Sequence, residues 1–192
     1  ARPDLPTTLQ RLEVKKVETT NVAVLQLALL SEDAPFRVLQ REAERIEDPA
    51  WSPRQRARRQ LALEWFHDLG GRFDINKEAG LKHVALAREA GALGAIPALS
   101  NLADTEFVLG HSEVAISLCR EAIERAAAIG RPATAVHAYG NMVPALLERG
   151  ELEAAEEAIR AGRALLVRGL GTAFVLLFPL ALLAQRRNQP EL

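Results

Sequence analysis

Residues 99–122 read LSNLADTEFVLGHSEVAISLCREA, and residues 139–162 read YGNMVPALLERGELEAAEEAIRAG. With Gly110 placed on Gly150, the two stretches agree in the size of their side chains. Each has an apolar run, a glycine and a second run with small residues at helical spacing, which is typical of two helices joined by a tight turn. A helical hairpin that recurs at a fixed spacing indicates a repeat fold.

Turn residues recur along the whole chain at a spacing of about 40 residues. A glycine just after an apolar run is typical of a helix end, because glycine adopts the left-handed conformation without a steric clash. One series consists of Ser31 and Glu32, Gly70 and Gly71, Gly110, Gly150 and Asn188; a second lies between its members, at Gly91, Gly130 and Gly169 or Gly171. Two interleaved series predict two helices in each repeat.

The composition agrees with stacked helices and excludes an all-β fold. The chain has 192 residues, of which 48% are hydrophobic but only 5% aromatic, and Ala and Leu are the commonest. The 24 basic and 25 acidic side chains nearly cancel, so we expect no direct contact with nucleic acid.

Membrane and compartment signals are also informative. The strongest apolar run, residues 173–184, contains Pro179 and is shorter than the roughly 20 residues that a spanning helix needs, so we expect a buried helix and no membrane contact. The single cysteine, Cys119, cannot form an internal disulfide, which fits a reducing, cytoplasmic location. Because the chain begins without a methionine or an apolar leader, we expect a part of a longer protein without a signal peptide.

On these residues the chain, from about residue 30 to its end, resembles the tetratricopeptide repeat family. The family's unit has a large apolar residue, then Leu and a small residue, a turn glycine, and small residues on the second helix. The matching positions are Leu99, Leu102, Ala103, Gly110, Ala115 and Ala122 in one copy and Tyr139, Met142, Val143, Gly150, Ala155 and Gly162 in the next. The repeat is longer than the family's usual length of about 34 residues, and the closing proline is missing. Longer repeats rich in Ala and Arg are similar to the helical sensor regions of bacterial MalT-like, signal-transducing ATPase transcriptional regulators.

The resemblance implies an all-α fold, a right-handed α-α superhelix of about four to five helical hairpins in a single domain. Its approximate repeats span residues 14–51, 52–91, 92–130, 131–170 and, in part, 171–192. The implied function is non-catalytic binding of a protein or peptide, including other domains of the parent chain, as the sensor part of a regulator. Two alternatives stay open: a sensor of a small molecule or signal peptide, and a free-standing scaffold or adaptor.

The first helices of such a superhelix line a concave groove. Alignment with the family implies these groove residues: Arg58, Trp65, Asp68, Ser100, Asn101, Asp104, Phe107, His137 and Asn141. Asparagine amides can pair with an extended backbone, and exposed aromatic rings supply contact area. A second interpretation stays open, in which the asparagines serve helix packing and Trp65 or Phe107 fills the core.

No pattern of catalytic or metal-binding residues is found in the sequence. The glycines at Gly70 and at Gly169 lack the lysine of a phosphate-binding loop, and the four histidines lack the spacing of metal ligands. Cys119 lies on an apolar stripe, which predicts a small hydrophobic residue rather than a nucleophile. We therefore expect no catalysis, no metal and no cofactor.

Four arginines, Arg54, Arg56, Arg58 and Arg59, begin one predicted helix. Arg54 and Arg58 share a helix face and could oppose a phosphate or an acidic partner. Because acidic residues follow one turn later and no aromatic residues are interleaved, a solvated helix face is the favoured interpretation.

The C-terminal apolar segment is predicted to associate with a second copy of the chain. A repeat array requires polar terminal caps, whereas this segment is apolar nearly all round. The residues expected to form a homodimer are Phe174, Leu177, Phe178 and Ala181.

The predicted helix over residues 132–147 should contain a weak point, because Pro144 lacks the amide that would bond to the carbonyl of Gly140. We expect the amides from Gly140 to Val143 to exchange with deuterium faster than those of the neighbouring helices. Native-state hydrogen exchange measures this directly, and equal protection would contradict the proposed weak point.

Overall fold

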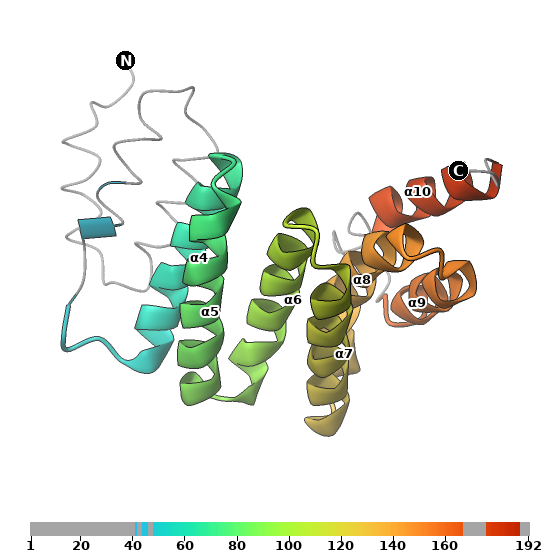
Figure 1. The fold of residues 1–192 in the computed structure, drawn as a ribbon. Helices are drawn as coiled ribbons and strands as arrows, with labels where there is room; N and C mark the ends of the chain where they lie inside the picture. The colour runs from blue at the N-terminus through green and yellow to red at the C-terminus, as the bar shows by residue number, and fades with distance from the viewer. Residues whose placement is uncertain (1–40, 42–43, 46–47, 167–175, 189–192) are drawn as a thin grey trace, which may run out of the picture. The chain divides into compact units, whose positions relative to one another are not determined.

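The computed structural model describes residues 41, 44, 45, 48–166 and 176–188, which form helices joined by short turns, with no strand among them (Figure 1). The predicted all-α class is therefore confirmed for the described part of the chain. The chain divides into two compact units, Ala1–Ala90 and Gly91–Leu192. The superhelix and the single domain stay predictions, and most of the first predicted repeat, 14–51, lies outside the described residues.

The helices come in pairs joined by short turns. The described helices of the first unit are α4 (Pro53–Leu69) and α5 (Phe73–Ala90). The second unit contains α6 (Ala92–Val108), α7 (Ser112–Ala128), a short 3-10 helix η1 (Pro132–Ala135), α8 (Val136–Glu148), α9 (Leu152–Ala164) and α10 (Leu177–Asn188).

Helices α4, α6, α7 and α8 all end with the same hydrogen-bonding motif. In α6, the amide of Gly110 donates to the carbonyl of Phe107, and the amide of His111 donates to the carbonyl of Glu106, at 2.9 and 2.8 Å. Gly71, Gly130 and Gly150 close the other three helices in the same way, and all four glycines have φ between 65° and 82°. This left-handed backbone is accessible to glycine at little cost, which explains why the glycine series marks the helix ends.

Helix α4 begins with a capping box, formed by Ser52 and Gln55. The amide of Gln55 donates to Ser52 Oγ at 3.3 Å, and the amide of Ser52 donates to Gln55 Oε1 at 2.9 Å. Pro53 occupies the first helical position, where its missing amide costs nothing. These contacts fix the start of the hairpin that α4 forms with α5.

In the second unit, α6 pairs with α7 and α8 with α9, while α8 also packs against α6 and α7 (Figure 1). Small side chains make this close packing possible, since Ala103 of α6, Ala115 of α7 and Ala145 of α8 are fully buried. The packing around Gly162 of α9 is equally close, since a Cβ added there would lie 3.1 Å from Tyr139 Cβ and 3.3 Å from a methyl of Leu176. Helix α10 packs on α8 and α9, and Arg187 pairs with Glu156 of α9.

Two proline predictions need correction. From the sequence, Pro97 is predicted to lie in the first turn of its helix, where proline is harmless. Helix α6 already begins at Ala92, so Pro97 lies beyond the first turn, and its ring removes a bond to the carbonyl of Leu93. Pro179, expected inside a helix, lies in the first turn of α10, where proline is tolerated. Pro144 lies inside α8 as predicted.

Replacing Ala115 with Leu tests the packing of small side chains. Ala115 has no exposed surface, so Ala115→Leu should lower the free energy of unfolding by about 1 to 3 kcal/mol through overpacking. The control is Ala127→Leu, the same substitution at an exposed position of the same helix. Urea denaturation compares the two variants, and equal stability would contradict a tightly packed crossing at Ala115.

Candidate functional site

The predicted groove residues fall on both units. Arg58, Trp65 and Asp68 lie on α4 in the first unit, and the others lie on α6 and α8 in the second. Trp65 has 43% of its surface exposed, so it does not fill the core. Asp68 is also exposed and Arg58 is half-buried; the partial burial of Asp68 raises the pKa of its carboxyl.

In the second unit, Asn141 and Ser100 hold two neighbouring helices together. Asn141 Nδ2 donates to the main-chain carbonyl of Ser100 at 2.9 Å and lies 3.3 Å from its Oγ. Ser100 is almost fully buried, with 1% of its surface exposed. The structure thus places these two residues in the packing of α8 on α6, as the second interpretation had it, and Ser100 is not accessible to a ligand.

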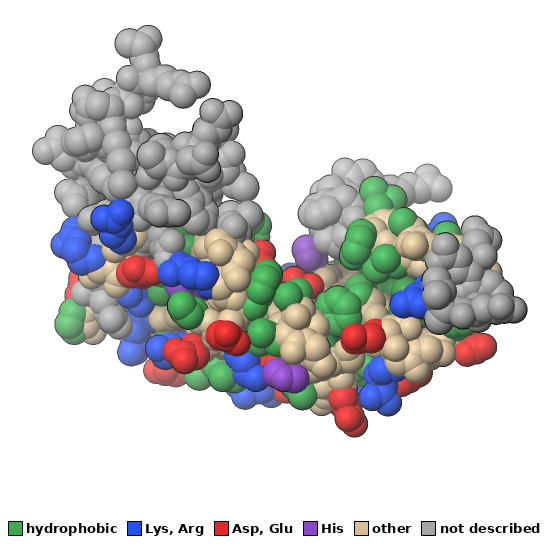
Figure 2. Space-filling view, turned by 45° about the horizontal axis from the view of Figure 1, so that its top comes forward, with side chains coloured by type: hydrophobic (Ala, Val, Ile, Leu, Met, Phe, Trp, Pro, Cys, Tyr) green, Lys and Arg blue, Asp and Glu red, His purple; other side chains and the backbone are tan. Residues whose placement is uncertain are grey.

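Apart from the buried Ser100, the predicted residues of this unit form what we call the α6–α8 surface: Asn101, Asp104 and Phe107 from α6, with His137 and Asn141 from α8. Asp104 and His137 are exposed, whereas Asn101, Phe107 and Asn141 are half-buried. Apolar side chains also reach the surface of this unit (Figure 2). Partial burial lowers the pKa of His137, which favours a neutral imidazole at neutral pH.

A buried pair of titratable residues in the first unit was missed by the sequence analysis. Glu64 Oε1 of α4 lies 2.8 Å from His83 Nδ1 of α5, and each side chain has only 6% of its surface exposed. With Gly71 placed on Gly110, His83 falls on Ala122, so the sequence has a histidine where the second hairpin has a small apolar residue. In the second unit Glu106, also buried, lies 2.6 Å from His111.

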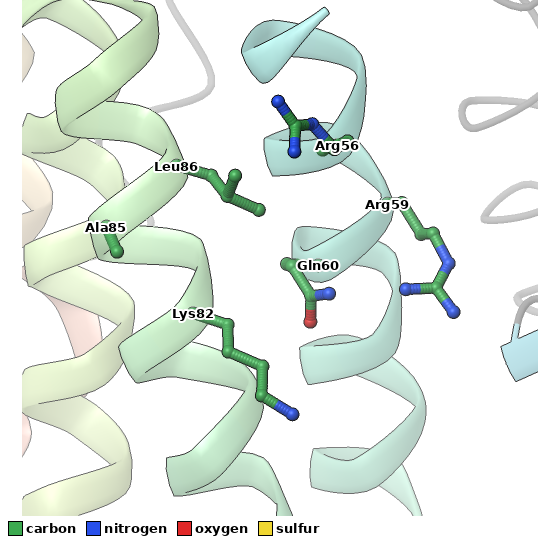
Figure 3. A pocket seen from close by; sticks show the side chains of 6 residues that line it. All are labelled: Arg56, Arg59, Gln60, Lys82, Ala85 and Leu86. Carbon is green, nitrogen blue, oxygen red and sulfur yellow. The ribbon is translucent and has the colours of Figure 1, made fainter. Parts of the chain in front are cut away.

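A groove between α4 and α5 was not predicted as a site (Figure 3). This α4–α5 groove encloses about 280 Å³ and is lined by Arg56, Arg59, Gln60, Lys82, Ala85 and Leu86. An adjoining cavity of about 390 Å³ shares Arg59, Gln60 and Lys82 with it. Two of the four arginines that the sequence analysis assigned to a solvated helix face, Arg56 and Arg59, therefore line a cavity.

The C-terminal apolar residues are partly covered. Phe174 lies outside the described residues, whereas Leu177 and Phe178 have 63% and 66% of their surfaces exposed, and Ala181 is exposed as well. Leu176 and Leu183 are buried, so one side of this segment packs within the unit. The homodimer stays a prediction.

Cys119 is buried among apolar side chains of the second unit. Burial, with a smaller contribution from the negative charge of Asp104, raises the pKa of Cys119 to about 12, so the thiol is not a nucleophile at neutral pH. Within the described residues, no group of three or more His, Cys, Asp or Glu side chains is placed to hold a metal ion. None of the described helices is both long and apolar enough to cross a bilayer.

His67 should make the first unit less stable in acid. Burial, helped by the positive charge of Arg72, lowers the pKa of His67, and Arg72 Nη2 lies 2.9 Å from its Nδ1. A histidine with a lowered pKa contributes stability above its unfolded pKa of about 6.5, and this contribution is lost as the pH falls. The free energy of unfolding, measured by urea denaturation, should decrease between pH 7.5 and pH 5. This decrease should be smaller in His67→Gln, by on the order of a few tenths of a kcal/mol or more.

Arg72→Met provides the second arm of this test. Removing the guanidinium should raise the His67 pKa, which NMR titration of the imidazole can follow. A His67 pKa at or above that of an unfolded histidine in the unmodified chain would contradict the assignment.

Comparisons of this chain with protein families, with curated proteins and with solved structures found no match. The resemblance to tetratricopeptide repeats and to regulator sensor regions therefore stays a prediction that rests on the residues of the chain.

Proposed function

We propose that this chain is a non-catalytic helical-repeat module that binds a protein or peptide segment on the α6–α8 surface. One observation supports the proposal above others: α6 and α8, the first helices of two successive hairpins, lie side by side and both end in the same glycine motif. Neighbouring helices in the same register offer rows of side chains to an extended or helical segment.

The charges on this surface favour a basic segment. Neither α6 nor α8 contains a lysine or an arginine, whereas Asp104 is an exposed acid of this surface. A neutral His137 would not repel a cation, and the half-buried ring of Phe107 offers an apolar contact. A peptide that combines Lys or Arg with an apolar residue is the complement of this surface.

The proposed biological role follows from the resemblance to sensor regions of bacterial transcriptional regulators. Binding on the α6–α8 surface would bias the parent protein between resting and active states, which requires unequal affinity for the two states. This role includes other domains of the same parent chain among the candidate partners.

Selection from a phage-displayed library of random peptides tests the binding function. We expect enriched peptides to carry a basic and an apolar residue, and Asp104→Lys to weaken their binding about tenfold, since it places like charges opposite each other. The matched control is Glu124→Lys, the same charge change at an exposed position of α7. Calorimetry on the full chain measures both, with circular dichroism to verify folding.

Two outcomes would contradict the proposal. The first is a selection in which no peptide is enriched relative to a support that carries no protein. The second is an equal loss of affinity in Asp104→Lys and Glu124→Lys, which would indicate a general charge effect rather than binding on the α6–α8 surface.

A further inference from the structure

Helix α4 carries a row of side chains that lies apart from its contact with α5. We call this row the α4 stripe, and it consists of Arg54, Arg58, Leu61, Trp65 and Asp68. These residues follow one another at alternating intervals of four and three positions, which places them on one face of the helix over a length of about 21 Å. Figure 3 shows Arg56 and Gln60 on the side of α4 that faces α5. The stripe and the hairpin contact therefore use different faces of α4.

The α4 stripe is open to solvent along its length. Arg54, Trp65 and Asp68 are exposed. Arg58 and Leu61, which lie between them, are half-buried. Trp65 is the largest side chain of the stripe, and 43% of its surface is exposed. An indole ring contributes strongly to binding, because it buries a large area at a low cost in conformational entropy. Trp65 is therefore the residue of the stripe that gains most from being covered.

The charged side chains of the α4 stripe are not engaged elsewhere in the described part of the chain. Arg54, Arg58 and Asp68 take part in no side-chain hydrogen bond or ion pair there. By contrast Arg59, on another face of the same helix, donates to the main-chain carbonyl of Glu44 at 2.8 Å. A binding partner can thus pair with the charges of the stripe without breaking an existing contact.

The spacing of the stripe is that of a seam between two packed helices. The second unit shows that a first helix of this chain receives another helix on the equivalent face. Leu61 corresponds to Ser100 of α6 when the glycines that end the two helices are aligned. The main-chain carbonyl of Ser100 accepts a hydrogen bond from Asn141 of α8 at 2.9 Å, and Ser100 is buried there. A helix is therefore the occupant that suits the α4 stripe.

The order of the charges along the stripe defines the chemistry of its partner. The stripe begins with two arginines, continues with two apolar residues and ends with a carboxylate. Its complement is a helix with two acidic, two apolar and one basic residue at the same spacing. A nucleic acid strand fits less well, because Asp68 repels phosphates. In addition, Trp65 is the only ring in the stripe, whereas single strands stack on successive rings.

We propose that the α4 stripe binds an acidic amphipathic helix of a partner protein. Acidic side chains of that helix pair with Arg54 and Arg58. Its apolar side chains cover Leu61 and Trp65, and its basic residue pairs with Asp68. Because one row of contacts buries less area than a stable interface, the association is transient, with micromolar affinity. The inference goes beyond the proposed function, which uses helices of the other unit and a basic segment.

Calorimetry and tryptophan fluorescence on the full chain test the proposal with designed peptides. Two alanine-based helical peptides of about 20 residues carry Glu, Glu, Leu, Leu and Lys at the spacing of the stripe, in opposite orders. We expect at least one of them to bind with micromolar affinity, whereas a third peptide, with Lys in place of each Glu, should not bind. In Trp51→Phe, which leaves Trp65 as the only indole, binding should shift the emission to shorter wavelength because the ring leaves water.

Two variants locate the binding on the stripe. Arg58→Glu should weaken binding about tenfold, because it places like charges opposite each other, and Trp65→Ala should weaken it by a similar factor. The matched controls are Lys82→Glu and Leu81→Ala, which make comparable changes at exposed positions of α5 and should leave the affinity unchanged. Circular dichroism verifies that each variant is folded.

Absence of binding by both peptides that contain Glu overturns the proposal. An equal loss of affinity in Arg58→Glu and Lys82→Glu also overturns it, because that result indicates general attraction between opposite charges. Tighter binding of a single-stranded oligothymidylate, weakened by Arg58→Glu, assigns the stripe to nucleic acid instead. Peptides bound on the α6–α8 surface are distinguished by their sensitivity to Asp104→Lys, so the two proposals fail separately.

Discussion

The left-handed glycine at the helix ends is the constraint on which the hairpins depend. Each of these glycines turns the chain and lets two backbone amides bond back to the last turn of the helix just completed. The carbonyls at a helix end would otherwise lack partners, and any side chain at this φ would be strained. Because these four helices end in the same way, the turns that follow them have similar geometry. Small residues at equivalent positions can therefore pack in the same way in successive hairpins.

Most of the local structure could be predicted from the sequence, because it is determined by neighbouring residues. The glycine series locates the ends of α4, α6, α7 and α8, and Ser52 with Gln55 locates the start of α4. The prolines were harder to place, because their effect depends on where a helix begins. The start of α6 at Ala92 carries no capping side chain that the sequence would reveal, because the residue before it is Gly91.

The candidate sites could be predicted only in part. The exposure of Trp65 and the burial of Ser100 depend on which neighbouring helix covers each face, and sequence spacing alone does not contain that information. The Glu64–His83 pair and the α4–α5 groove each need residues from two helices brought together. A run of arginines on one helix looked solvated because its opposite wall, with Lys82 and Leu86, comes from the next helix.

The burial of Cys119 has a practical consequence for the chain as a whole. It is the only thiol in the sequence, and it has no exposed surface and a pKa far above neutrality. A thiol-specific reagent can therefore react only after α7 has moved away from its neighbours. The protein carries its own reporter for opening of the second unit, without any engineered label.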